Sequence, residues 1–401
     1  MRIGIAGAGI GGLSLAILLR DAGLHPEIFE RFDAPKPVGS GLVIQPVGQD
    51  ILAQMGCLEN VLSHGNKITR MLGKQVRSGR RVLDVSYDPK QTGASYGLSI
   101  QRASIFDALY RGARQRAIPI HTSHAITGYA DKHFVFEDRT HSDRFDLLVD
   151  ASGARSKLSP LNSKHLSYGA LWAKLDWDEG VGLDKTQLSQ RYDGAHKMVG
   201  VMHTGVMPNE HKASAAFFWS LPADSYETWR QEGLVKWRSE ALALWPEIEP
   251  FVAQIGDPDQ FTMARYSHGT LRRPYREGIA FIGDAAHRAS PQLGQGANMA
   301  LLDAAALSWA LVEFGSDKGP AAYAKARRLH VAIYQLMSWA FTPMYQSNSR
   351  ILPFLRDRAL FPLSQIPPVP KLLTSLVCGN MTAPIRSLPQ TTPSTRALRS
   401  R

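Results

Sequence analysis

The segment that most constrains the fold is a glycine-rich turn near the N-terminus. Residues 2–6 have the apolar character of a short buried strand, and the sequence GAGIGG at residues 7–12 leads directly into an apolar helix. In such a turn Gly7 permits a tight bend, Gly9 lets bare backbone approach a pyrophosphate, and Gly12 allows the helix to pack closely on the strand. The order of strand, turn and helix predicts an α/β domain that binds a dinucleotide.

A second strand and an acidic residue support this interpretation. Residues 26–29 predict the strand, and Glu30 ends it about 20 residues after the turn, where a carboxylate accepts hydrogen bonds from a ribose. The run from Met1 to Leu19 also has the outline of a secretory signal peptide. A signal peptide requires neither the glycine spacing nor the acid, so we favour the nucleotide-binding fold.

The segment 278–304, GIAFIGDAAHRASPQLGQGANMALLDA, predicts another ligand-binding turn. Residues 278–283 have the pattern of an apolar strand, and Asp284 stands where that strand ends, with its carboxylate free to accept hydrogen bonds from ligand hydroxyls. Residues 294–296 then bring bare backbone to the start of an apolar helix, expected over 297–311, whose unpaired N–H groups favour negative charge. A reduced flavin carries such a charge.

Two further motifs complete an ordered set. Gln101 and Arg102 open a helix expected over residues 103–114, and the sequence DLLVDASGARS covers residues 146–156. With GAGIGG before them and GDAAH…P…GQG after them, the chain resembles the single-component (group A) FAD-dependent monooxygenases of the p-hydroxybenzoate hydroxylase and salicylate hydroxylase-like type. The resemblance covers most of the first 345 residues, and the order of the motifs makes it specific.

The resemblance implies an enzyme that binds FAD without a covalent link and takes electrons from NADH or NADPH. Dioxygen would form a flavin 4a-hydroperoxide that inserts one oxygen atom into an aromatic or other lipophilic small molecule. It also implies that Arg102 contacts the FAD phosphates and Asp284 the ribityl chain. The full set of residues expected to contact FAD is Gly7, Gly9, Ile10, Gly11, Gly12, Glu30, Arg31, Arg102, Ile126, Asp284, Pro291, Gly294, Gly296 and Ala297.

One position departs from the family pattern. Where the family usually has an aspartate before a glycine, this chain has Ser152; Arg155 is kept, and Ser159 stands where the family's arginine would fall. Asp150 lies two residues earlier, roughly 6–7 Å away along a strand, and is not an obvious substitute. Because the family's aspartate is associated with both FAD and the nicotinamide phosphates, the choice between NADH and NADPH stays open.

We expect a discontinuous α/β architecture: a Rossmann-like FAD-binding domain, an inserted, mainly antiparallel sheet that binds substrate (an α+β part), and a helical C-terminal part. The expected ranges are 1–75, 96–160 and 276–345 for the FAD-binding domain, 76–95 and 161–275 for the substrate domain, 346–385 for the helical segment, and 386–401 for a disordered basic tail.

The inserted sheet should hold the substrate and any catalytic base. Trp172, Phe217 and Trp219 are candidates for its pocket, with core packing as an equal alternative. A base that removes a phenolic proton would assist hydroxylation, and the candidates for that role are His203, Tyr192 and Tyr266. Ordinary packed residues are the commoner outcome, so the catalytic residue stays unassigned.

The C-terminal part is aromatic, basic and interrupted by Pro343, Pro353 and Pro362, and no stretch in it is long enough to cross a bilayer. Its aromatic residues are expected either to pack on the nucleotide domain and substrate pocket or to touch a membrane surface peripherally. These residues are Trp339, Phe341, Tyr345, Phe354 and Phe361.

Composition narrows the partners. The 401 residues are 44% hydrophobic and carry a formal charge of +11, but the basic residues are dispersed and form no nucleic-acid module, so we expect small-molecule partners and no nucleic acid. Cys57 and Cys378 are the only cysteines, which favours a reducing cytosol and no disulfide framework. Neither cysteine stands near other potential metal ligands in the sequence, so we expect no metal site. The oligomeric state stays open.

Three alternatives remain at this stage. The sequence FFWSLP at residues 217–222 faintly echoes a flavin-dependent halogenase motif, with Lys67 or Lys74 as the halogen-carrying lysine. A non-catalytic flavoprotein could sequester a hydrophobic small molecule, which Ser152 and the aromatic C-terminal part suggest. A membrane-bound quinone-pathway hydroxylase would differ mainly in its localisation.

Overall fold

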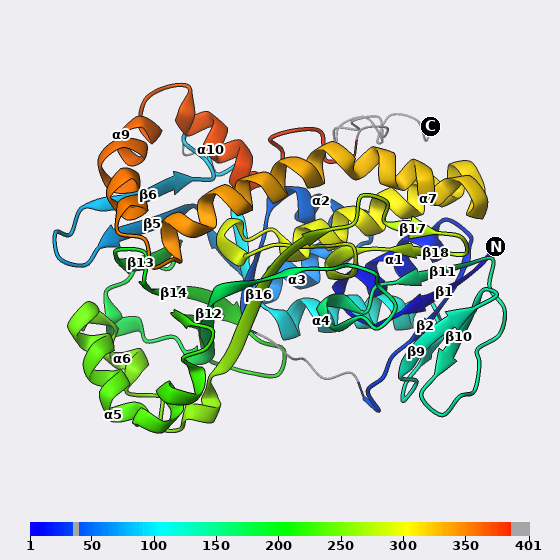
Figure 1. Cartoon of the computed structure of the whole chain (residues 1–401), viewed down its shortest axis with the longest axis horizontal. Coiled ribbons are helices and arrows are strands. Elements are labelled where there is room, and N and C mark those ends of the chain that lie inside the picture. The colour runs from blue at the N-terminus through cyan, green and yellow to red at the C-terminus, as the bar shows by residue number, and fades with distance from the viewer. Residues whose placement is uncertain (35–39, 91, 386–401) are drawn as a thin grey trace.

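The computed structural model describes residues 1–34, 40–90 and 92–385. A parallel sheet forms the nucleotide-binding half, on the right in Figure 1. Its strand order is β17 (Tyr275–Arg276), β18 (Ile279–Phe281), β11 (Leu147–Asp150), β1 (Arg2–Ala6), β2 (His25–Phe29) and β8 (Ile120–His121), and all neighbours are parallel except β17 and β18. The expected Rossmann-like α/β fold is confirmed.

Helices cover this sheet because their apolar faces can be buried only there. Helix α1 (Ile10–Asp21) packs against α7 (Gly296–Tyr345) and α4 (Arg102–Gln115), and together with β1 they form the largest hydrophobic core. Helices α2 (Pro46–Gln54) and α3 (Leu58–His64) contribute to the same core. At about 25 cal/mol per Å² of buried apolar surface, a core of this extent is the main stabilising contribution to this half.

The second large sheet has eight strands and lies on the left in Figure 1. Only the β13–β5 pair is parallel. Its order is β19 (His287–Arg288), β16 (Thr262–Thr270), β12 (Lys164–Asp176), β15 (Ala213–Pro222), β14 (Lys197–Val206), β13 (Gln187–Asp193), β5 (Arg70–Gln75) and β6 (Arg81–Ser86). The expected boundary after residue 75 is therefore wrong, because β5 already pairs with β13 in this sheet.

One face of this sheet packs on helix α5 (Tyr226–Leu244) and the short α6 (Glu249–Val252). The two smaller sheets are β3 (Gly41–Ile44), β7 (Gly97–Gln101) and β4 (Asn66–Ile68), and the hairpin of β9 (Ile126–Ala130) with β10 (His133–Phe136). The opposite face of the eight-stranded sheet is turned toward the nucleotide-binding half, which leaves room for a ligand between the two.

Helix α7 consists of two helical segments that meet at the non-helical Gly315, where φ is 70° and ψ is −176°. The first segment ends a few residues beyond the expected residue 311, and the second runs to Tyr345. Pro343 lies in its last turn and does not end it there. By length and hydropathy one 18-residue window of α7 could cross a membrane, but 61% of that window is buried inside the protein, as in the core helix of a globular domain.

The C-terminal segment is helical, as expected. It comprises α8 (Ile351–Leu355), a π-helical turn (Arg356–Leu360), α9 (Phe361–Ser364) and α10 (Val369–Cys378). Pro353 lies within α8, and Pro362 stands in the first turn of α9, where a proline costs little. The basic tail at 386–401 falls outside the described residues.

Candidate active site

A cavity of about 1150 Å³ separates the two halves. It begins at the turn between β1 and α1, passes the loop before α7, and ends between the eight-stranded sheet and the C-terminal helices. All residues expected to contact FAD line it except Gly12. The fold thus brings together segments that are almost 300 residues apart in the chain.

The first turn has the geometry that its glycines predicted. Gly7 has a φ of +99°, which favours glycine, and its N–H donates to the carbonyl of Phe29 at 2.8 Å. A Cβ on Gly12 would lie 2.0 Å from the carbonyl oxygen of Gly7, so Gly12 sets the close packing beneath the turn. A Cβ on Gly9 would meet nothing within 4 Å, because this residue faces the open cavity.

Glu30 both borders the cavity and holds the turn. One carboxylate oxygen accepts from the Ala8 N–H at 2.8 Å, and the other accepts from the Arg31 N–H at 2.8 Å. This bracing of the turn was not expected from the sequence. A carboxylate oxygen can accept more than one hydrogen bond, so both remain able to accept from a ligand hydroxyl.

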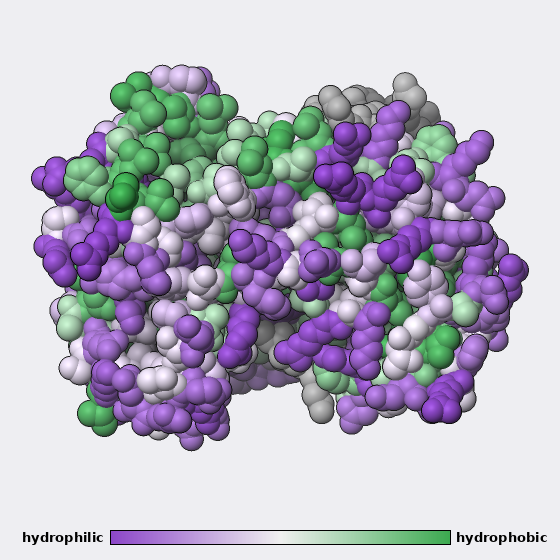
Figure 2. Space-filling view, viewed as in Figure 1, coloured by the Kyte–Doolittle hydropathy of each residue, from purple (hydrophilic) through white to green (hydrophobic). Residues whose placement is uncertain are grey.

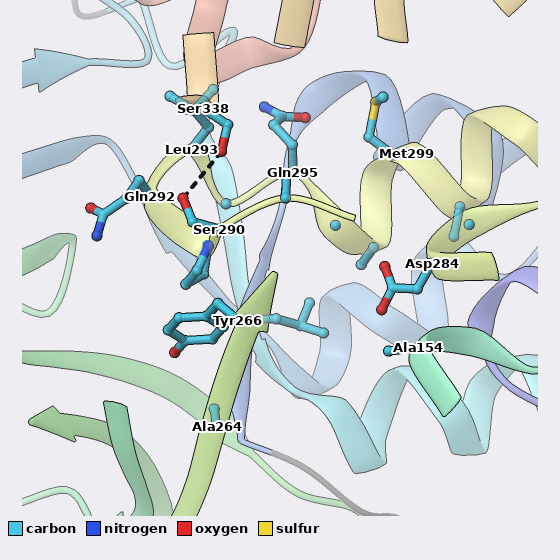
Figure 3. Close-up of a pocket in the computed structure, with 18 of the residues that line it drawn as sticks. Ala154, Ala264, Tyr266, Asp284, Ser290, Gln292, Leu293, Gln295, Met299 and Ser338 are labelled. Carbon is cyan, nitrogen blue, oxygen red and sulfur yellow. Dashed lines mark hydrogen bonds between the residues drawn. The ribbon is translucent and has the colours of Figure 1, made fainter. Parts of the chain in front are cut away.

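Asp284 projects its carboxylate into the cavity (Figure 3). The side chain is exposed to the cavity, yet protein surrounds it. This enclosure raises the pKa of the carboxyl, while His287, Arg102 and Arg288 oppose the rise. Arg102 lines the same cavity from the start of α4.

Next to Asp284 lies a buried ionic network that the sequence did not reveal. Asp303, in α7, accepts from the Gly283 N–H at 2.9 Å, from His287 Nε2 at 2.7 Å and from Arg327 Nε at 2.8 Å. Burial by itself would raise the pKa of the Asp303 carboxyl, but His287 and Arg327 together lower it to about 2. The only signal for this network was an aspartate within an otherwise apolar helix sequence.

The second glycine loop is fixed by amide side chains. Gly294 has a φ of +61°, and its carbonyl accepts from Asn298 Nδ2 at 3.1 Å. Gln295 donates from Nε2 to the carbonyls of Leu376 and Val377 at 3.4 and 3.2 Å, which joins the loop to α10. The C-terminal segment therefore helps to hold the loop that the sequence assigned to the flavin.

These features fit an FAD. The N-terminus of α1 has no side-chain cap, so its N–H groups and dipole can take a pyrophosphate in the open space at Gly9. Arg102 adds positive charge, Glu30 and Asp284 supply acceptors for hydroxyls, and residues 294–296 offer bare backbone at the N-terminus of α7. The individual contacts remain predictions.

Ser152 does not replace the family's acid but binds the acid two residues earlier. Its hydroxyl and its N–H both donate to Asp150 Oδ1, at 2.5 and 3.0 Å, and the Ser156 hydroxyl donates to Asp150 Oδ2 at 2.5 Å. Asp150 is fully buried, and burial raises the pKa of its carboxyl. An aspartate at position 152 would place a second carboxylate against that of Asp150, and the repulsion between the two gives a physical reason for the serine.

Strand alternation decides which aromatic residues reach the substrate end of the cavity. Phe218 lines it, whereas the neighbouring Phe217 and Trp219 point to the opposite face and pack against Trp237 of α5. The prediction that Phe217 and Trp219 line the pocket is therefore wrong. Trp172 does line it.

The structure likewise places only two of the three candidate bases at the cavity. His203 points to the α5 side, where its ring contacts Trp177 at 4.9 Å between centroids, so it cannot serve as a base in this cavity. Tyr192 and Tyr266 line the cavity, but burial raises the pKa of both phenols above the usual value. Both hydroxyls keep their protons near neutral pH and act as hydrogen-bonding groups.

The lysines considered for halogenation lie elsewhere. Lys67 sits over the ring of Tyr96 at 4.6 Å, and neither Lys67 nor Lys74 lines the cavity. The cavity lacks the lysine that the halogenase alternative requires at either position.

Comparison with known proteins agrees with this geometry. A family model described as "FAD binding domain" matches residues 1–332. The chain belongs to this family. FAD-dependent urate hydroxylase of Mycolicibacterium vanbaalenii is 28% identical over 355 residues, which are 82% of this chain and 84% of that one. 6-Methylpretetramide 4-monooxygenase of Streptomyces rimosus is 24% identical over 402 residues, 96% of this chain and 93% of that one.

Solved structures share the fold. A Klebsiella pneumoniae protein complexed with FAD and uric acid has a TM-score of 0.78 at 20% identity, covering 94% of this chain and 97% of that chain. The tetrameric form of 2-methyl-3-hydroxypyridine-5-carboxylic acid oxygenase has a TM-score of 0.77 at 18% identity, with 93% and 95% covered. The family and its relatives make this chain an FAD-dependent monooxygenase that uses NAD(P)H.

Asp284→Ala should reduce FAD binding by at least tenfold, because a charge-assisted hydrogen bond contributes about 1.5–3 kcal/mol. Flavin fluorescence titration measures the affinity, and circular dichroism shows whether the chain stays folded. The matched control is Asp317→Ala, because Asp317 lies on α7 and does not line this cavity. Full FAD occupancy in the Asp284 variant would show that Asp284 is not part of the cofactor site.

Proposed function

We propose that this monooxygenase hydroxylates an apolar, mainly aromatic small molecule held between the flavin and the eight-stranded sheet. The observation that carries the proposal is the apolar lining at that end of the cavity. These residues are Met71, Val82, Val85, Trp172, Leu188, Met198, Met202, Phe218, Phe341, Phe361, Leu373, Leu376 and Val377. A site lined in this way favours ligands with large apolar surface and few charges.

Trp172 and Tyr266 supply directional contacts in this lining. The Trp172 ring lies 4.8 Å from that of Phe218, and its Nε1 donates to the Tyr266 hydroxyl at 2.8 Å. Within the described chain the Tyr266 hydroxyl donates to no acceptor, so its proton is available to an oxygen or nitrogen of the substrate. Figure 3 shows Tyr266 below the loop that carries Ser290 and Gln292.

When FAD is bound, it supplies the activation of dioxygen after reduction by NADH or NADPH. The residues of the chain bind and orient the substrate and exclude water from the reacting centre. The relative named for urate supports a ring-bearing substrate. Cys57 and Cys378 are both free and buried, which supports a cytosolic location.

A substrate panel tests this function. Purified, FAD-loaded protein is mixed with NADH or NADPH and with pairs of aromatic compounds that differ only by a carboxylate. We expect the neutral member of each pair to stimulate reductant oxidation more strongly and to yield a product heavier by one oxygen atom. Preferential turnover of the charged members would contradict the proposed substrate class.

Ala264→Leu tests the location of the substrate. Ala264 lines the cavity beside Tyr266 on β16 (Figure 3), so added bulk there should raise the KM for the aromatic substrate at least tenfold while FAD content stays unchanged. Thr262→Leu is the control, because Thr262 is exposed on the same strand and does not line the cavity. Equal KM values in the two variants would place the substrate elsewhere.

A further inference from the structure

The C-terminal helices, residues 351–378 and here termed the C-terminal cap, have two apolar faces. The inner face lines the cavity mainly with apolar residues, together with the buried Arg356 and with Ser364; the apolar members are Leu360, Phe361, Leu373, Leu376 and Val377. The outer face is exposed to solvent through Ile351, Phe354, Leu355, Leu363, Ile366 and Leu372, whose exposed fractions range from 43% to 75%. Only one layer of short helices separates the substrate end of the cavity from this outer surface.

The exposed apolar residues are concentrated in one region. Of the twelve large hydrophobic side chains that are strongly exposed in the described chain, eight lie between residues 336 and 372. Two of the eight, Leu336 and Trp339, lie in the last part of α7, the helix that contacts α8 of the cap. Figure 2 shows apolar side chains gathered over α9 and α10, whereas most of the remaining visible face is hydrophilic. Clustered apolar surface of this kind marks an interaction site.

The charges in this region are positive. Arg350, Arg358 and Lys371 are exposed, and none of them has an ion-pair partner in the described part of the chain. The one acidic residue between 346 and 385 is Asp357, which accepts from the buried Arg356 at 2.6 Å. An apolar surface with unpaired cations is complementary to an anionic lipid surface, where each nearby cation adds to binding.

A second copy of the chain fits this surface less well. A symmetric dimer places the same patch on both partners, so Arg350, Arg358 and Lys371 would approach their own copies without acids to pair with them. A bilayer with anionic headgroups has the opposite sign of charge and accepts the apolar side chains among its acyl chains.

We propose that the outer face of the C-terminal cap docks on an anionic lipid bilayer, from which the lipophilic substrate enters the cavity through the cap. The entry route rests on the proposed function, but the docking surface does not. Gln295 links the cap to the second glycine loop through the carbonyls of Leu376 and Val377, so docking takes place next to the active site.

Flotation with vesicles of phosphatidylcholine, with and without phosphatidylglycerol, tests the docking surface. We expect the FAD-loaded full chain to float with the anionic vesicles, and added salt to weaken binding. The variant Ile351→Ser/Phe354→Ser/Ile366→Ser and the variant Arg350→Glu/Arg358→Glu/Lys371→Glu should each lose at least about tenfold in binding. The matched control Val235→Ser/Val312→Ser/Phe314→Ser removes exposed apolar residues elsewhere and should bind like the unaltered chain.

FAD content, and turnover of a soluble substrate, should be equal in all these proteins, because the altered residues do not line the cavity. Three results would overturn the proposal: no binding to anionic vesicles, equal binding by the cap variants, or a concentration-dependent dimer that the cap variants abolish while vesicles stay unbound. Vesicle binding is measured without turnover. Binding that persists when no lipophilic compound is hydroxylated would therefore contradict the proposed substrate class and not the docking surface.

Discussion

Arg327→Met should lower the free energy of unfolding by about 3–5 kcal/mol, the usual cost of removing one partner of a buried ion pair. Arg327 and Asp303 are 2% and 0% exposed and are joined at 2.8 Å. Without the guanidinium, the Asp303 carboxylate stays buried with only His287 Nε2 and the Gly283 N–H as hydrogen-bonding partners. Arg327 also donates to the carbonyl of Pro384 at 2.6 Å, so the end of the described chain should loosen. Urea unfolding followed by tryptophan fluorescence measures the change.

The control for this prediction is Lys236→Met. Lys236 and Glu232 form an exposed pair across the non-helical Gly233, and exposed pairs contribute about 0.2–1 kcal/mol. The folded-state pKa of Asp303, about 2, lies below that of an unfolded aspartate. The pair therefore contributes its full stability above about pH 4 and loses it as the pH falls toward 2. The decrease in the free energy of unfolding caused by Arg327→Met should be largest at neutral pH and become smaller on acidification. A small decrease, or one independent of pH, would show that the network is not ionic.

Gly12→Ala should destabilise the protein and Gly9→Ala should not, whereas both should weaken FAD binding. The new Cβ at position 12 would meet a backbone oxygen at 2.0 Å, so α1 must shift, at a cost of about 1–3 kcal/mol or more. The new Cβ at position 9 has open space, and the unliganded protein should be as stable as before. FAD affinity should fall at least tenfold in both variants. A side chain at position 9 occupies space needed by the pyrophosphate, and the shift of α1 in the Gly12 variant displaces the helix N-terminus that faces it.

Fluorescence titration with FAD and urea unfolding of the FAD-free proteins measure the two effects separately. Gly256→Ala is a suitable control, because its Cβ would meet its nearest neighbour at an ordinary 3.8 Å and the residue lies outside the cavity. If Gly9→Ala binds FAD as tightly as the unaltered chain, the pyrophosphate does not lie over this turn.

The sequence by itself determined the nucleotide-binding half, because the required chemistry there is local. A glycine is favoured where φ is positive and needed where bare backbone must approach a ligand, so Gly7 and Gly294 can be recognised without knowing what surrounds them. Hydrophobic periodicity likewise identified β1 and α1 to within a residue or two. The order of these local motifs was sufficient to indicate the family.

Only the tertiary structure decided which residues face the substrate. Period-two alternation in β15 shows that Phe217 and Phe218 point to opposite faces, but the position of α5 determines which face is covered. The local sequence does not encode which of the two faces is covered. For the same reason the sequence could not show that His203 lies on the α5 side and not at the cavity. The Asp303–Arg327 pair joins residues 24 positions apart, and the contacts of Gln295 with α10 join residues 81 and 82 positions apart. Such long-range contacts form only when the chain is folded, because burial gives these polar groups no other partners.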